Sequence, residues 1–304
     1  MTTITHYYRV AGFWMSVSLP ETCDANALLP SFRPFRHESC GDSAMLFNCT
    51  VCLQPDGEPD GTPGAVIEET ENDMGYIRLY ARPRGYGVHL SVEPGGLLHT
   101  MRACSDFSDV SIRLCPGDGA AGRMLSSLLR IAYSQAILYH EALSIHASAV
   151  YLEGRAFLFM GKSGTGKSTH SSLWMKHIPG TGLLNDDNPT VRIVGGKAYA
   201  CGTPWSGKTP CYKDLFFPIG GMARLHQAAE NRYCAQEGAD AFVALFPGCS
   251  AICSDGGLRR RLYDTLSSLA GMVPVGLLGC RPDREAALLC HKALHEAYET
   301  MRNQ

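Results

Sequence analysis

The stretch Gly161-Lys-Ser-Gly-Thr-Gly-Lys-Ser-Thr169 matches the spacing G-x-x-x-x-G-K-[ST] without a mismatch. Its glycines allow successive backbone N–H groups to turn toward an anion, and the following helix adds its positive end. Lys167 suits the β- and γ-phosphates of a nucleotide, and the Ser168 hydroxyl suits Mg²⁺. The motif predicts an ATP site that consists of Gly161, Lys162, Ser163, Gly164, Thr165, Gly166, Lys167, Ser168 and Thr169.

Two adjacent carboxylates, Asp186 and Asp187, follow a short apolar run after the helix expected behind this loop. An apolar strand that ends in acid is where a Mg²⁺-binding carboxylate belongs in a phosphate-loop protein. One aspartate would bind the metal together with Ser168, and the other would accept a proton from an incoming hydroxyl. The residues leave open which aspartate does which, and an Asp-Asp turn without catalytic function is the alternative.

The elements around the loop follow from local patterns. Residues 155–160 form an apolar run typical of a buried strand, and an amphipathic helix is expected from Thr169. Residues 144–152 alternate as a strand and end at Glu153-Gly154, a two-residue hairpin turn. The turn pairs Leu152 with Arg155, which carries His146 to the mouth of the phosphate loop. We therefore include His146 among the candidate catalytic residues.

A second hairpin is expected around Gly195-Gly196, between the strands 190–194 and 197–201. Its register places the loop that begins at Gly202 beside the two aspartates. This loop contains Lys208, whose ammonium would neutralise a phosphate during transfer, so Lys208 is also a catalytic candidate. A plain Pro/Gly connector is the alternative interpretation.

Residues 1–116 contain short runs with strand patterning, separated by turns rich in Gly, Pro and Asp. They predict an antiparallel β-rich module with no catalytic constellation. A domain boundary is expected at Pro116–Gly119, because the next stretch has helical apolar spacing and the candidate site residues follow that stretch. The second predicted domain spans residues 117–304.

The composition fits a globular protein, with 45% hydrophobic and 18% charged residues. The net charge of −2 and the scattered basic residues argue against nucleic-acid binding, and no run is long and apolar enough to suggest a membrane span. The 13 cysteines form no disulfide framework, and Cys49-x-x-Cys52 lacks a second pair for zinc. We expect a cytoplasmic protein.

The run from Ile145 to Thr169, followed by Leu-Leu-Asn-Asp-Asp187, resembles the catalytic domain of HPr kinase/phosphorylase and its bacterial kinase-like relatives. ATP-dependent phosphoenolpyruvate carboxykinase shares that fold family. The resemblance implies an α/β phosphate-loop kinase core with a mixed sheet, assembly into a homo-oligomer, and functional roles for His146, Lys167, Ser168, Asp186 and Asp187.

Two departures bear on the activity. The bifunctional enzymes have Glu where this chain has Thr169, and residues 273–287 lack their C-terminal P-G-R-N-type signature. We therefore expect an ATP-dependent kinase without phosphorylase activity, whose acceptor is a hydroxyl, seryl above all, of a protein, a peptide or a small molecule. The alternatives are a nucleotide-binding scaffold without turnover and, with less support, a carboxykinase.

Overall fold

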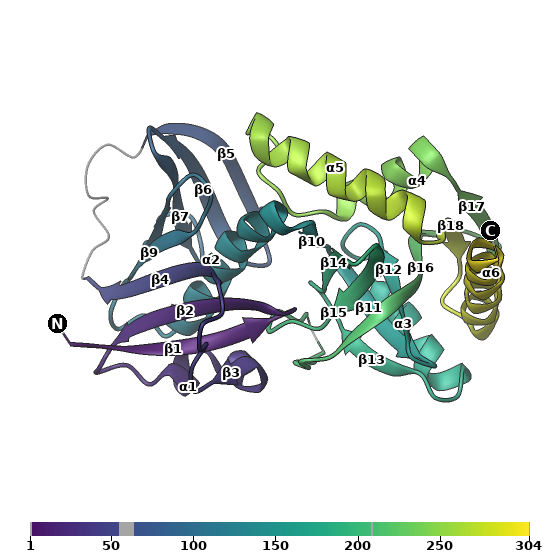
Figure 1. The fold of residues 1–304 in the computed structure, drawn as a ribbon, viewed down its shortest axis with the longest axis horizontal. Coiled ribbons are helices and arrows are strands. Elements are labelled where there is room, and N and C mark those ends of the chain that lie inside the picture. Colours follow the sequence, from purple (N-terminus) through teal and green to yellow (C-terminus); the bar gives the residue numbers. More distant parts are fainter. Residues whose placement is uncertain (1, 55–63, 208, 304) are drawn as a thin grey trace. The chain divides into compact units, whose positions relative to one another are not determined.

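The computed structural model describes residues 2–54, 64–207 and 209–303. The described chain divides into two compact units, residues 1–139 and 140–304, each with a large mixed sheet (Figure 1). The protein is thus a mixed α/β protein. Among the described helices, none combines the length and the apolar character that a membrane crossing requires.

The sheet of the first unit has the strand order β3-β1-β2-β4-β9-β8-β7-β6-β5. Residues 11–12 adopt positive φ, as a tight hairpin turn between β1 and β2 requires. The strands are β1 Thr3–Val10, β2 Phe13–Pro20, β3 Arg36–His37, β4 Met45–Leu53, β5 Ala65–Asn72, β6 Gly75–Arg82, β7 Gly85–Ser91, β8 His99–Ala103 and β9 Asp109–Leu114.

The prediction of an antiparallel β-rich first module is confirmed for six of the eight strand pairings of the described sheet and wrong for two, because β2 pairs with β4 in parallel and β4 pairs with β9 in parallel. The connection from β2 to β4 contains the short helix α1 (Ala25–Leu28) and a 3₁₀ turn at Pro30–Phe35, which return the chain to the same end of the sheet. Asp24 caps α1 by accepting a hydrogen bond from the Asn26 amide.

The helix α2 (Ala121–Ala136) belongs to the first unit. The division between the units therefore lies between residues 139 and 140, later in the chain than the predicted boundary at Pro116–Gly119. Its apolar residues recur at helical spacing and are buried: Met124, Leu125, Leu128, Leu129, Ala132, Tyr133 and Ala136. This apolar stripe packs on β7, β8, β9 and α1, and therefore the helix joins the module that precedes it.

The second unit contains a sheet with the order β10-β14-β15-β16-β12-β11-β13, to which β18 and β17 add beside β16. Its strands are β10 Ala142–Ser144, β11 Ala147–Leu152, β12 Arg155–Met160, β13 Gly182–Asn185, β14 Thr190–Val194, β15 Lys197–Cys201, β16 Phe216–Gln227, β17 Arg232–Gln236 and β18 Val275–Cys280. Its helices are α3 Lys167–His177, α4 Gly238–Leu245, α5 Gly256–Met272 and α6 Arg284–Arg302, with a 3₁₀ turn at Phe246–Gly248. Another 3₁₀ turn, Ile137–His140, spans the division between the units.

Both hairpin registers predicted from the sequence are confirmed: Leu152 pairs with Arg155, and Thr190 pairs with Cys201. The single strand predicted over residues 144–152 is instead two strands, because the chain changes neighbours at Ile145–His146. The Ile145 amide donates to the Pro189 carbonyl at 3.2 Å, and the His146 amide donates to the Gly248 carbonyl at 2.7 Å.

One core of the second unit lies between its sheet and the helices α3 and α6, which contact each other. Trp174 of α3 is fully buried there and packs against Phe157 and Phe159 of β12. The helix that follows the phosphate-loop motif is thereby fixed to the strand that precedes it. A strand and a helix held in this way determine where the loop between them can lie.

Candidate active site around the phosphate-loop motif

The motif residues connect β12 to α3, in the strand–loop–helix order that the sequence predicted. Gly161, at φ 154°, passes so close to its neighbours that an added Cβ would meet the Leu225 carbonyl oxygen at 3.1 Å. Gly166, at φ 104°, is the N-cap of α3 in the left-handed region. Glycine is required at these two points for different reasons, one for close approach and one for backbone conformation.

The loop is braced by its own hydrogen bonds. The Thr165 hydroxyl donates to the Lys162 carbonyl at 2.6 Å, and the Thr165 amide donates to the same oxygen at 3.1 Å. The Lys167 ammonium reaches back to the Gly161 carbonyl at 3.2 Å. An ammonium and a helix N-terminus therefore lie together at this loop, which is the arrangement that binds a phosphate.

The turn after β13 holds the two aspartates through Asn185, which is fully buried. Its side-chain oxygen accepts hydrogen bonds from the Asp187 amide at 3.0 Å and the Asn188 amide at 2.8 Å. Its side-chain nitrogen donates to the Trp205 carbonyl at 3.0 Å. One asparagine thus shapes the acidic turn and attaches it to the following loop.

Asp186 is 5% exposed and connects to α3 through two hydroxyls. Its Oδ1 accepts from Ser148 Oγ at 2.8 Å, and Ser148 Oγ lies 2.6 Å from Ser171 Oγ on α3. Its Oδ2 is buried and has no hydrogen-bond partner among the described residues. A buried carboxylate oxygen without a partner costs free energy unless a proton donor or a cation satisfies it. This oxygen, next to hydroxyl groups, fits the oxygen ligands that Mg²⁺ takes.

Asp187 faces a different partner. Its Oδ1 lies 3.5 Å from Nε2 of His146, with side-chain exposures of 14% and 42%. His146 comes just before the last hairpin pair, Ala147 with Met160, as the predicted register required. The Ala147 amide also donates to the Asp187 carbonyl at 3.0 Å, which holds the two segments together.

Within the described part of the chain, no three His, Cys, Asp or Glu side chains converge on a point. A cation bound at the aspartates would therefore need hydroxyl groups and water in its shell, as Mg²⁺ sites generally have. The sequence-predicted set of Ser168, Asp186 and Asp187 has this mixed character.

The loop from Gly202 lies against the acidic turn, as the second hairpin predicted. The Thr203 hydroxyl donates to the Asn188 carbonyl at 2.8 Å. A Cβ added to Gly207 would meet the Asp186 carbonyl oxygen at 2.9 Å, so the backbone passes close by. The catalytic candidate Lys208 is outside the described residues.

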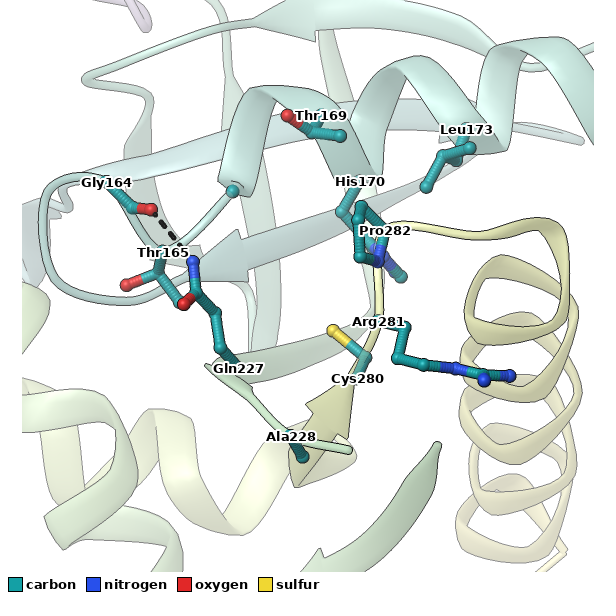
Figure 2. A pocket seen from close by; sticks show the side chains of 11 residues that line it. Gly164, Thr165, Thr169, His170, Leu173, Gln227, Ala228, Cys280, Arg281 and Pro282 are labelled. Atoms are coloured by element: carbon teal, nitrogen blue, oxygen red, sulfur yellow. Dashed lines mark hydrogen bonds between the residues drawn. The ribbon is translucent and has the colours of Figure 1, made fainter. Parts of the chain in front are cut away.

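A cavity of about 460 Å³ opens beside the phosphate loop (Figure 2). Its wall consists of the loop, the first turns of α3 and the carboxyl ends of β16 and β18. The strand β16 runs parallel to β12, and β18 runs parallel to β16. The carboxyl ends of parallel strands are where open α/β sheets bind ligands. The lining residues are Gly164, Thr165, Gly166, Thr169, His170, Leu173, Gln227, Ala228, Cys280, Arg281 and Pro282.

Sequence reasoning missed the far wall of this cavity, which Gln227, Cys280 and Arg281 help to form. The Gln227 side chain donates to the Gly164 carbonyl at 3.4 Å and so touches the loop itself (Figure 2). The sequence indicates where the apolar strands β16 and β18 end. It does not indicate that they run parallel to β12, which is what brings their ends to the phosphate loop.

His170 lines the same cavity and is almost fully buried. Burial lowers the pKa of His170 to about 4, so the ring is neutral near pH 7. The Trp174 indole N–H donates to His170 Nε2 at 3.1 Å, which places the ring proton on Nδ1. The wall of the cavity therefore offers a neutral imidazole of fixed tautomer.

No protein-family model and no curated protein matches this chain. Among solved structures, the Hpr(Ser) kinase/phosphatase from Coxiella burnetii is similar to it, with a TM-score of 0.32 and 12% sequence identity. That match covers 52% of this chain and 98% of the other chain. A likeness of this size assigns neither a fold nor a function.

Proposed function

We propose that this protein is an ATP-dependent kinase that phosphorylates a hydroxyl group, seryl above all, of a protein, a peptide or a small molecule. One observation supports this most. Asp186 has a buried carboxylate oxygen without a partner among the described residues, and it is linked through Ser148 and Ser171 to α3, the helix that follows the phosphate loop. The loop suits a phosphate chain, and the carboxylate suits the cation that accompanies it.

The different surroundings of the two aspartates suit them to different roles, metal binding for Asp186 and proton acceptance for Asp187. Asp186 and Ser168 would hold Mg²⁺, because Asp186 Oδ2 is the buried oxygen that needs a positive partner. When bound, Mg²⁺ would neutralise phosphate charge and orient the terminal phosphate. Lys167 and the backbone N–H groups of the loop would hold the phosphates in place, which supplies most of the catalysis in phosphoryl transfer.

Asp187 would accept the proton of the attacking hydroxyl. It is less buried than Asp186 and has the His146 ring 3.5 Å away, so His146 would orient it. The cavity beside the loop would take the nucleoside, since it begins at Gly164–Gly166 and continues along α3. A cavity of about 460 Å³ is within the range of ~300–1,000 Å³ found for small-molecule sites.

A turnover assay separates this proposal from a nucleotide-binding scaffold. The purified chain is incubated with Mg-ATP and a degenerate peptide library centred on serine, and ADP release is compared with that for the same library centred on alanine. We expect the serine library to increase ADP release by the wild type and not by Asp187→Asn. If the wild type binds Mg-ATP but releases ADP no faster than Asp187→Asn with either library or with water, the chain is a binding module and the proposal is wrong.

A further inference from the structure

The first unit contains a second cavity, of about 450 Å³, that the proposed kinase function does not use. It lies at one end of the sheet, between the β6–β7 turn and the strands β8 and β9. Three of its lining residues are arginines, Arg82, Arg84 and Arg102, and one is an aspartate, Asp109; the others are Pro83, Ala103, Cys104 and Ser111. We call it the arginine pocket.

The strand register explains why the pocket is open. Arg82 pairs with Gly85, Gly87 pairs with Arg102, and Arg102 pairs with Ser111, so these side chains share one face of the sheet. The intervening strand β7 presents two glycines on that face, and no side chain fills the space between its neighbours. Gly85 cannot be replaced, because an added Cβ would meet the Ala103 carbonyl oxygen.

Two arginines of the pocket, Arg82 and Arg84, differ from other arginines of the same unit. Arg78 is held by Glu69, with two hydrogen bonds at 3.1 and 3.0 Å, and Arg130 lies 3.5 Å from Asp73. In the described part of the chain, neither Arg82 nor Arg84 makes an ion pair. Two guanidinium groups of the pocket therefore lack an ion-pair partner among the described residues.

The acidic side chains nearby do not balance the arginines, because Asp109 is the single carboxylate among the described lining residues and three arginines face it. Asp106 is turned into its own loop, where Cys104 Sγ at 2.9 Å and Ser108 Oγ at 2.7 Å hydrogen-bond to its carboxylate. These hydrogen bonds lower the pKa of Asp106 to about 2, so it stays ionised in that turn. His89, on the same face of β7, adds no charge near pH 7, since burial, followed by Arg78, lowers its pKa.

We propose that the arginine pocket binds an acidic segment of a peptide or protein through its carboxylates. Guanidinium groups bind carboxylates with two parallel hydrogen bonds. Arg82 ends β6 and Arg84 lies two residues further on in the β6–β7 turn, so their backbones are roughly 6–7 Å apart. An extended chain can present carboxylates to both, since residues two apart lie on the same side of the chain and are separated by about 7 Å. The inference is independent of the proposed kinase activity.

Fluorescence anisotropy on the full chain tests the pocket. The probe is a short fluorescein-labelled peptide of alternating Glu and Gly, and the reference probe has Gln in place of each Glu. We expect the Glu peptide to bind at least about tenfold more tightly, and raised salt to weaken it. The double variant Arg82→Ala/Arg84→Ala should lose this preference. Its residues lie at a hairpin turn, so the fold should be preserved, which circular dichroism checks.

The double variant Arg33→Ala/Arg260→Ala is the matched control, because it removes the same charge from exposed positions outside the pocket. It should bind the Glu peptide as the wild type does, and so should Lys167→Ala, whose change is confined to the phosphate loop. Equal weakening by the two arginine double variants would show a net-charge effect and overturn the proposal. Release of the peptide by an equal concentration of inorganic phosphate would make the pocket a phosphate site and also overturn it.

Discussion

Nε2 of His146 lies 3.5 Å from Oδ1 of Asp187, although 41 positions separate the two residues in the chain. His146 immediately precedes β11, and Asp187 belongs to the turn after β13. Because β11 pairs with both β12 and β13, the same strand brings the imidazole to the phosphate loop and to the acidic turn. The proposed orientation of the base rests on this pairing.

The two aspartates should respond differently to neutralisation. We expect Asp186→Asn to lose Mg²⁺-dependent ATP affinity, because the amide cannot supply the charge of the buried Oδ2. Asp187→Asn should bind Mg-ATP normally and lose acceptor-dependent turnover by about 10²–10⁴-fold, the usual contribution of a general base. Calorimetry and an ADP-release assay measure the two effects. Asp264→Asn, an exposed change on α5, should alter neither, and identical defects in the two site variants would contradict the assignment.

The hydroxyl link between Asp186 and α3 should contribute to stability. Ser148→Ala removes the donor to Asp186 Oδ1 and leaves the Ser171 hydroxyl without its 2.6 Å contact. We expect the free energy of unfolding to fall by about 1–3 kcal/mol, the cost of an unsatisfied buried polar group. Urea denaturation measures this fall. Ser172→Ala, an exposed change on the same helix, should cost less than about 0.5 kcal/mol.

The buried imidazole of His170 should make the protein less stable in acid. Its folded-state pKa of about 4 lies below the usual value of 6.5, so the unfolded chain binds the proton first. Its contribution to stability is therefore complete above pH 6.5 and is lost as the pH falls toward 4. The loss reaches roughly 3 kcal/mol for a shift of this size.

Chemical denaturation of wild type and His170→Gln between pH 7 and pH 4 isolates this effect from that of other histidines. Glutamine cannot titrate in this range but can still accept the Trp174 hydrogen bond. The wild type should lose more stability than His170→Gln over the interval. Parallel pH profiles would show that His170 is not the buried titrating group.

The cavity beside the loop should determine the affinity for the nucleoside and not for the phosphates. Ala228→Trp places an indole in the cavity wall (Figure 2). The matched control is Ala229→Trp, because Ala229 is not among the lining residues. We expect Ala228→Trp to weaken ATP binding at least tenfold and to leave inorganic tripolyphosphate binding within about twofold, because only ATP has a nucleoside to exclude. Equal losses for both ligands would place the nucleoside elsewhere.

The sequence predicted the features that local rules determine. The Glu153-Gly154 and Gly195-Gly196 turns fix the registers of their hairpins, since both positions of each turn have positive φ. From these registers followed the place of His146 and the approach of the loop at Gly202 to the acidic turn. The motif spacing alone indicated the strand–loop–helix unit that residues 155–177 form.

The features that the sequence did not predict depend on contacts distant along the chain. Parallel pairing of β2, β4 and β9 has no local register signal, because long connections join the strands. The edge strand β5 carries no strand signal in the sequence, because its exposed glutamates do not resemble a strand with a buried face. The cavity wall at Gln227 and Cys280 requires the order of the parallel strands. The amphipathic α2 could have packed on either unit, so the boundary was placed too early.

Isothermal titration of Mg-ATP into the wild type, Lys167→Ala and Lys176→Ala tests the central claim most directly. Both lysines are on α3, but Lys167 reaches the phosphate loop and Lys176 is exposed near the helix C-terminus. We expect one site per chain, a loss of at least about tenfold in affinity for Lys167→Ala, and wild-type affinity for Lys176→Ala. Equal Mg-ATP affinity in all three proteins would contradict a nucleotide site at this loop.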